Sequence, residues 1–233
     1  MSLEVEVLAS EAVAIPAYLA KTYWWAYVHP AAVRVFERQW LVNLILWGNF
    51  GRLRDAALDG MGATLDGRTL QVACVYGDLT GRLAARVSPG GALDVVDVLP
   101  IQLRNLARKL PAGAPVNLVH GDSTRIPAAD ASYERVLVFF LLHEQPEEAR
   151  RATLAEALRV LKPGGRLVVV DYHRPQAWHP LRLLMRQVLA RLEPFALDLW
   201  RADLVRWMPD MAALSIRKRT YYGGLYQVLE IAR

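Results

Sequence analysis

The chain of 233 residues contains a single cysteine, Cys74, which excludes a disulfide framework and a metal site built from several thiolates. No apolar run approaches the roughly 18 residues that a membrane-spanning helix needs; the nearest candidate is residues 41–47. The net charge is +5, but the basic residues are scattered without a polybasic block, so we expect no nucleic-acid partner. No basic residue precedes Lys21, which argues against a signal or transit peptide and predicts a cytoplasmic protein.

Hydrophobic residues make up 54% of the chain and charged residues 22%, enough for one α/β domain with an appendage. From residue 68 onward, apolar β-like runs alternate with amphipathic helical runs, which is typical of a parallel sheet flanked by helices. The predicted strands are residues 69–75, 92–99, 116–120, 133–141 and 166–172, followed by a hairpin of residues 214–221 and 225–232. We therefore predict an α/β fold with a doubly wound, mostly parallel seven-stranded sheet.

Two segments do not follow this alternation and are rich in tryptophan. All seven tryptophans lie in residues 16–59 or 175–210, namely Trp24, Trp25, Trp40, Trp47, Trp178, Trp200 and Trp207. We predict that residues 1–60 form an N-terminal helical cap, and that residues 175–210 form a helical insertion in an α/β domain of residues 61–233.

Acidic side chains end two consecutive predicted strands, where ligands of open parallel sheets bind. Asp97 follows the second strand, where it could accept hydrogen bonds from both ribose hydroxyls, and Asp122 follows the third, where it could accept from an adenine amino group. Each could instead cap a helix. The loop of residues 72–80 retains only Gly77 and is a weak signal, but the two aspartates together favour a nucleoside site.

These features, with the turn of residues 161–165 (Leu-Lys-Pro-Gly-Gly), resemble class I S-adenosylmethionine (SAM)-dependent methyltransferases over about residues 68–173. The resemblance implies that residues 61–233 form a Rossmann-like, SAM-binding domain. The implied cofactor contacts are Ala73, Cys74, Tyr76, Gly77, Asp97, Val98, Asp122 and Ser123.

A second likeness covers nearly the whole chain. Residues 21–30, 37–49, 72–80, 139–146 and 171–175 resemble the RquA family of rhodoquinone biosynthesis proteins. That resemblance implies an enzyme that converts ubiquinone to rhodoquinone, with SAM as the donor of an amino group that replaces a ring methoxy group. It also implies a manganese(II) requirement.

The cofactor loop departs from the methyltransferase pattern. Gln71 stands at the usual acidic position, and Ala73 and Val75 replace the first two glycines. One hypothesis is that Tyr76 and Asp78 re-aim the methionine moiety, so that its amino group faces the substrate. The alternatives are a conventional methyltransferase acting on a quinone or another hydrophobic small molecule, and a binding protein without activity.

The candidate catalytic residues are Tyr76, Asp78 and His143. His143, just past the fourth strand, could act as a base or, with Asp78 and Asp171, ligate manganese, or it could simply position the substrate. The candidate quinone contacts are Tyr23, Trp24, Tyr27, His143 and Tyr172, although the aromatics of residues 23–27 could equally be core residues.

An apolar stripe at helical spacing runs along residues 181–192, with Arg182, Arg186 and Arg191 beside or behind it. The helix could simply cover the sheet, or it could rest on anionic lipid and admit a polyprenylated quinone from the bilayer. The second interpretation predicts a protein peripheral to the inner membrane.

Overall fold

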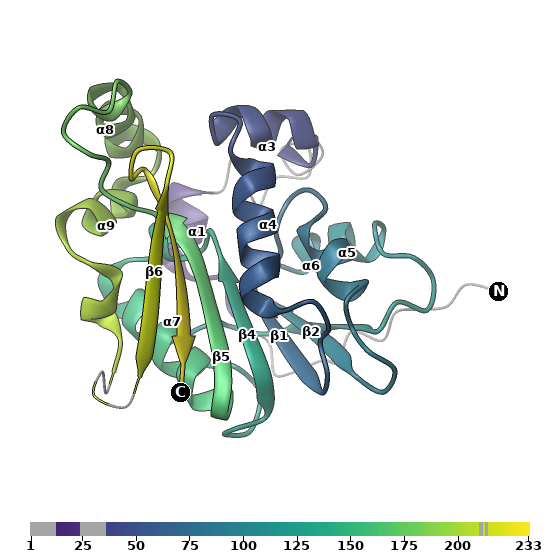
Figure 1. Ribbon diagram of the computed structural model, residues 1–233. Coiled ribbons are helices and arrows are strands. Elements are labelled where there is room, and N and C mark those ends of the chain that lie inside the picture. The colour runs from purple at the N-terminus through teal and green to yellow at the C-terminus, as the bar shows by residue number, and fades with distance from the viewer. Residues whose placement is uncertain (1–12, 24–35, 210–211, 213) are drawn as a thin grey trace.

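A seven-stranded sheet forms the centre of the molecule in the computed structural model, which describes residues 13–23, 36–209, 212 and 214–233 (Figure 1). The strand order is β3-β2-β1-β4-β5-β7-β6. The first five strands pair in parallel, and β7 pairs antiparallel with both β5 and β6. The strands are β1 Arg68–Val72, β2 Ala92–Asp97, β3 Val116–His120, β4 Tyr133–Phe139, β5 Leu161–Tyr172, β6 Ser215–Tyr221 and β7 Tyr226–Ala232. The predicted doubly wound sheet and its closing hairpin are confirmed.

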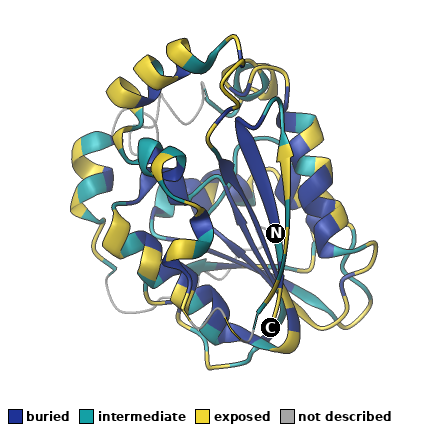
Figure 2. Ribbon diagram, turned by 60° about the vertical axis from the view of Figure 1, so that its left-hand side comes forward, coloured by how far each residue is buried: buried dark blue, intermediate teal, exposed yellow. Residues whose placement is uncertain are grey.

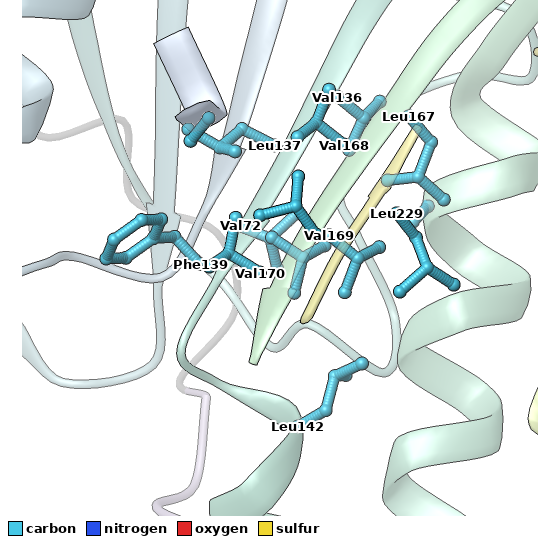
Figure 3. Packing of buried hydrophobic residues seen from close by; sticks show 14 of the residues in the cluster. Val72, Val136, Leu137, Phe139, Leu142, Leu167, Val168, Val169, Val170 and Leu229 are labelled. Carbon is cyan, nitrogen blue, oxygen red and sulfur yellow. The ribbon is translucent and has the colours of Figure 1, made fainter. Parts of the chain in front are cut away.

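The central strands are buried on both faces because helices cover the sheet on each side. In Figure 1, α4 (Phe50–Met61) crosses in front of the sheet and α7 (Glu147–Val160) lies behind it. Figure 2 shows dark, buried strands between helices whose outer faces are exposed. The packed aliphatic core is drawn in Figure 3 and includes Val72, Val136, Leu137, Leu167, Val168, Val169, Val170 and Leu229.

The Lys162–Gly165 turn was expected to separate a helix from a strand that begins at residue 166. Instead, α7 ends at Val160 and β5 begins at once with Leu161, which pairs with Tyr133 before the register shifts. The fully buried Leu161 side chain holds this early pairing in place. The turn therefore forms a bulge within a longer strand, and Gly164 adopts φ +77° there.

The remaining helices of the central domain connect consecutive strands, as expected for a parallel sheet. They are α5 Leu79–Ala84, α6 Pro100–Ala107 and the 3-10 helix η2 Leu142–Glu144. Because the five parallel strands run the same way, their carboxyl ends meet at one edge of the sheet. The loops that follow β1, β2, β3 and β4 all lie at this edge.

The N-terminal region contributes α1 (Ala17–Thr22), which begins after Pro16, and α3 (Gln39–Ile45). Helix α4, most of which lies within residues 1–60, packs on β4, β5 and β7. The division of the chain into an N-terminal helical cap of residues 1–60 and an α/β domain of residues 61–233 remains a prediction. Trp24, Trp25, Tyr27 and Pro30 lie outside the described residues.

The predicted insertion folds into α8 Arg182–Leu192, η3 Pro194–Leu197, α9 Asp198–Arg201 and η4 Leu204–Trp207. Helices α3 and α8 both stand at the end of the molecule where the parallel strands finish (Figure 1). Within the part of the chain that the structure describes, no helix is both long and apolar enough to cross a bilayer.

Candidate active site

A cavity of about 580 Å³ opens at the carboxyl edge of the sheet. Its floor is made by the loops after the parallel strands: Ala73–Tyr76, Val96–Leu99, Gly121–Ser123 and Phe139–Leu141. Its walls come from distant parts of the chain, namely Tyr18, Leu19, Phe36, Val42, 44–47, Met185, Val188, Leu189, Leu192 and Glu193. The lining is mostly apolar with a few polar groups, which is typical of a site for a small organic ligand.

Asp97 lies at the end of β2 on the cavity wall and is 8% exposed. Its Oδ2 accepts a hydrogen bond from the Cys74 backbone N–H at 2.7 Å, and its Oδ1 accepts one from Leu99 N–H at 2.7 Å. Burial raises the pKa of Asp97 to about 6, although these two hydrogen bonds oppose the shift. Helix α6 has Leu99, not Asp97, as its N-cap. The two hydrogen bonds of Asp97 instead link the loop after β1 to the loop after β2.

Asp122 and Ser123 line the same cavity beyond β3. Asp122 Oδ1 accepts a hydrogen bond from Thr124 N–H at 2.8 Å. Ser123 Oγ accepts from Gln145 Nε2 at 3.0 Å and contacts Thr153 Oγ1 at 2.9 Å. Asp97, Asp122 and Ser123 are thus brought to one wall, as the nucleoside prediction requires.

The unusual cofactor loop has a structural explanation. Ala73 has φ 70°, a left-handed conformation that favours glycine. Gln71 is fully buried; its Nε2 donates to the Ala73 carbonyl at 2.9 Å, and its Oε1 accepts from Thr80 Oγ1 at 3.0 Å. A carboxylate could not donate to that carbonyl. The amide at the usual acidic position therefore holds the loop and is not among the residues that line the cavity.

Tyr76 and Gly77, which follow in the same loop, have different surroundings. Tyr76 lines the cavity, its hydroxyl accepts from Gln102 Nε2 at 2.8 Å, and its ring stacks on Phe36 with centroids 6.1 Å apart. Gly77 has φ +86°, and a Cβ there would lie 2.9 Å from Cζ of Phe50. The position therefore needs glycine for both conformation and space.

Asp78 does not join the other predicted catalytic residues. It is not part of the cavity lining, and its carboxylate pairs with Arg54 at 2.9 Å and Arg82 at 2.6 Å. Partial burial would raise its pKa, but hydrogen bonds from Arg82, Arg54 and Gln39 outweigh that effect and lower it to about 2. The arginines thus hold Asp78 at the start of α5, outside the cavity.

The residues predicted to ligate manganese do not fit a metal site. Asp171 is fully buried, and its carboxylate accepts backbone N–H groups from Leu142 at 2.9 Å and Tyr172 at 2.7 Å. Asp78 is paired with arginines elsewhere. Across residues 13–23, 36–209, 212 and 214–233, no three His, Cys, Asp or Glu side chains group as metal ligands. The predicted set of His143, Asp78 and Asp171 therefore does not assemble.

His143 is 5% exposed on the cavity wall, with Nδ1 at 3.0 Å from Oδ1 of Asp171 and Nε2 at 3.7 Å from Oε1 of Glu144. Burial would lower its pKa, but the negative charges of Asp171, Glu193 and Glu144 outweigh burial and raise it to about 9. The acidic neighbours therefore favour the protonated form of the imidazole. The predicted roles of His143 as a base, a metal ligand or a group that positions the substrate stay predictions.

Of the predicted quinone contacts, His143 and Tyr172 line the cavity, and their rings meet edge to face with centroids 5.0 Å apart. Tyr23 is fully buried and is not part of the lining. Trp24 and Tyr27 lie outside the described residues. The aromatic character of the site therefore comes from the end of the sheet as well as from the N-terminal helices.

Three lining residues were missed by the sequence interpretation. Glu193 ends α8, and burial raises its pKa although His143 and Tyr23 oppose the shift. Tyr18 contributes from α1. Phe140 adopts φ 51°, and its ring centroid lies 5.9 Å from that of His143. One signal could have identified Glu193, since it is the first acidic residue after an acid-free stretch of residues 173–192.

Comparison with known proteins agrees with this geometry. A methyltransferase domain family matches residues 69–165, which contain the cofactor loop, Asp97 and Asp122. Among solved structures, a SAM-dependent methyltransferase from Aquifex aeolicus aligns with a TM-score of 0.54 at 16% identity, over 87% of this chain and 97% of its own. The N-methyltransferase NodS of Bradyrhizobium japonicum, in complex with S-adenosylhomocysteine, aligns with a TM-score of 0.59 at 13% identity, over 86% and 96% of the two chains.

The chain is also similar to curated proteins. The demethylmenaquinone methyltransferase of Renibacterium salmoninarum is 29% identical over 202 residues, covering 78% of this chain and 81% of the relative. The demethylmenaquinone methyltransferase of Staphylococcus aureus is 32% identical over 135 residues, covering 58% of this chain and 55% of the relative. The chain therefore spans only about half of the second relative. Neither name refers to rhodoquinone, so the RquA likeness, amino transfer and manganese remain predictions.

Proposed function

We propose that this protein is a SAM-dependent transferase that modifies the ring of a prenylated quinone. The observation that carries the proposal is a single cavity with two kinds of wall. Asp97, Asp122 and the 73–76 loop offer hydrogen-bonding groups that suit a nucleoside, and the aromatic and aliphatic residues of the lining suit a flat, apolar ring. Demethylmenaquinone in the names of the relatives supports the substrate class.

The residues present fit SAM. Asp97 has lone pairs remaining on both oxygens for the ribose hydroxyls, and Asp122 and Ser123 are placed for the adenine. The Ala73–Tyr76 backbone lies beside them for the methionine moiety. When bound, SAM supplies an electrophilic methyl group on its sulfonium and a nucleophilic α-amino group on its methionine end.

His143 acts on a ring oxygen. Its protonated imidazole, held by Asp171, donates a hydrogen bond to a quinone oxygen and stabilises negative charge that develops there. Glu193 lies on the same cavity wall with a raised pKa, which suits a carboxylate that accepts a proton from a ring hydroxyl or an attacking amine. The apolar walls exclude water from these groups.

Methyl transfer is the better supported reaction because the matching domain and the relatives are methyltransferases. Amino transfer, in which the amino group of SAM replaces a ring methoxy group of ubiquinone, is the second candidate. It is favoured by the sequence of the loop, in which Ala73 and Val75 replace the first two glycines of ordinary methyltransferases and Tyr76 follows them. Gln71 stands at the usual acidic position and donates a hydrogen bond to the Ala73 carbonyl within the loop. Such a loop presents a different surface to the methionine end.

The deciding experiment uses SAM labelled with ¹³C in the methyl group and with ¹⁵N in the amino group. The protein is incubated with short-chain ubiquinone or with reduced short-chain demethylmenaquinone, and the quinone is analysed by mass spectrometry. Gain of ¹³C identifies methyl transfer, and gain of ¹⁵N with loss of methoxy identifies amino transfer. Parallel reactions with Mn²⁺ or with a chelator test the manganese requirement. Unlabelled quinone in every reaction, together with no SAM binding by calorimetry, would overturn the proposal.

A prenylated quinone resides in a bilayer, so the proposed substrate places the enzyme at a membrane surface. We therefore propose that the protein works at the periphery of the inner membrane, with ubiquinone or a related quinone as its lipid-soluble substrate. The positive face of α8 supports this location.

A further inference from the structure

Large apolar side chains that are exposed to solvent gather on one part of the described molecule. Nine such residues are exposed, and eight of them lie on or beside α3 and α8, whereas the ninth is Ile15. Leu183 and Trp178 are the most exposed, at 76% and 71%. The eight, called here the α3–α8 face, are Trp40, Leu44, Ile45, Trp47, Trp178, Leu183, Leu184 and Leu192.

Helix α8 is apolar on two sides. It buries Met185 and Leu189 over the cavity, so these residues account for its packing on the domain. Leu183 and Leu184 are exposed and are not part of the cavity lining. A helix that only covered a domain would not need this second apolar side. Exposed tryptophan and leucine together are typical of a surface that enters the interface of a bilayer.

The α8 side of this face carries basic charge without any acid. Residues 173–192 contain four arginines and no aspartate or glutamate. On the other side, Arg52 and Arg54 lie on α4, and Arg54 pairs with Asp55 and Asp78. The whole chain has a net charge of +5, so the residues outside 173–192 sum to +1. Positive charge is thus concentrated on the α8 side, where apolar side chains are exposed. That combination is complementary to anionic lipid.

The α3–α8 face is continuous with the cavity. Leu44, Ile45, Trp47 and Leu192 belong to both the exposed set and the cavity lining. The indole Nε1 of Trp47 donates to Sδ of Met185 at 3.1 Å, which joins the end of α3 to α8. In Figure 1 both helices stand at the same end of the molecule. An apolar chain that leaves the cavity between them would emerge on this face.

We infer that the α3–α8 face docks on a bilayer that contains anionic lipid and passes a prenyl tail between membrane and cavity. The passage of a prenyl tail into the cavity rests on the proposed function, whereas docking on the bilayer does not. A second copy of the chain is the less suitable occupant, because a two-fold interface would set the arginines of one copy against those of the other.

Vesicle flotation tests docking directly, with the full chain and vesicles of phosphatidylcholine with or without phosphatidylglycerol. We expect flotation with the anionic vesicles and a large loss in high salt. The double variant Leu183→Gln/Leu184→Gln should lower the partition coefficient by about tenfold or more, because two exposed apolar side chains no longer enter the interface. Arg186→Gln should lower it by about fivefold, whereas Arg104→Gln on α6, equally exposed, should leave it unchanged.

The proposed reaction and the proposed docking can be tested separately. Leu183→Gln/Leu184→Gln should retain activity on a short-chain, water-soluble quinone and lose it on a long-chain quinone in vesicles. Normal flotation without any labelled product would contradict the proposed reaction but not the proposed docking. No flotation of the wild type, or a dimer in light scattering that the double variant abolishes, would overturn the docking and assign the face to another occupant.

Discussion

At the scale of single residues, the site is governed by burial among charges. His143 is almost fully enclosed, yet three acidic neighbours raise its pKa to about 9. Asp97 is enclosed without a strong cationic partner, and its pKa rises to about 6. Opposite charge thus favours the ionised histidine, whereas desolvation disfavours the ionised aspartate. The two pKa values are thus raised for opposite physical reasons.

Replacing His143 by glutamine should lower kcat by about 100-fold with little change in SAM affinity, because a protonated donor is lost. The wild-type rate should fall as pH rises through about 9, where the imidazolium loses its proton, and the variant should lack that fall. Rates measured from pH 6 to 10 check this. A wild-type rate that instead rises through pH 9 would assign His143 the role of a base.

The same residue links pH to stability. The folded-state pKa of His143 is raised above its ordinary value of 6.5, so its stabilisation is fully present below pH 6.5 and is lost as pH rises through about 9. Urea unfolding of the wild type should therefore show declining stability over that window. His143→Gln should show a smaller decline.

At the scale of elements, one buried arginine connects η2, the turn that carries His143, to the insertion. Arg150 on α7 is fully buried; its Nε donates to the carbonyl of Leu142 at 3.0 Å, and its Nη2 donates to those of Gln145 and Phe195 at 2.9 Å. Its guanidinium also lies 4.4 Å from the ring centroid of Trp207. These contacts fix η2, which carries His143, against η3. Arg150 is therefore a positioning residue.

Arg150→Met should lower the free energy of unfolding by about 3–5 kcal/mol, because two buried carbonyls and one part-buried carbonyl lose their donor. Arg151→Met is the matched control on the same helix, since Arg151 is exposed and pairs only with exposed groups; it should cost less than about 1 kcal/mol. Urea denaturation gives both values. Equal losses for the two variants would contradict the positioning role.

At the scale of the whole molecule, the site is assembled from segments far apart in the chain. Part of the lining comes from the ends of β1, β2 and β3, whereas other parts come from Tyr18, Leu19, Phe36, Val42, residues 44–47 and the segment of residues 185–193. Ligand binding should therefore stabilise the fold as a unit. A ligand at one hundred times its Kd adds about 2.7 kcal/mol to the free energy of unfolding.

Saturating SAM should raise the melting temperature by about 5–10 °C at this ligand excess. Asp97→Asn should remove most of the shift, because an amide accepts fewer hydrogen bonds from the ribose hydroxyls. Asp66→Asn, an exposed aspartate before β1, should retain it. Differential scanning calorimetry with and without SAM provides the comparison, and an undiminished shift in Asp97→Asn would remove this residue from the cofactor site.

The strands were predictable because their physical cause is local. Runs such as Val136–Val138 and Val168–Val170 are apolar enough to require burial on both faces, whatever surrounds them. The positions of Asp97 and Asp122 follow from the strands, since the carboxyl ends of parallel strands share one edge. The edge of the sheet that holds the cavity, and the two aspartates there, could therefore be predicted from the order of the strands along the chain.

The tertiary structure alone decided which way the side chains turned and what charge they carried. Asp78 follows Gly77 by one position, but distant Arg54 holds it outside the cavity, while Glu193 reaches the cavity from the insertion. The charge of His143 depends on Asp171 and Glu193, which lie 28 and 50 positions away in sequence. Local pattern determines elements because the backbone's periodicity is local, whereas pairing and pKa depend on neighbours that only packing brings together.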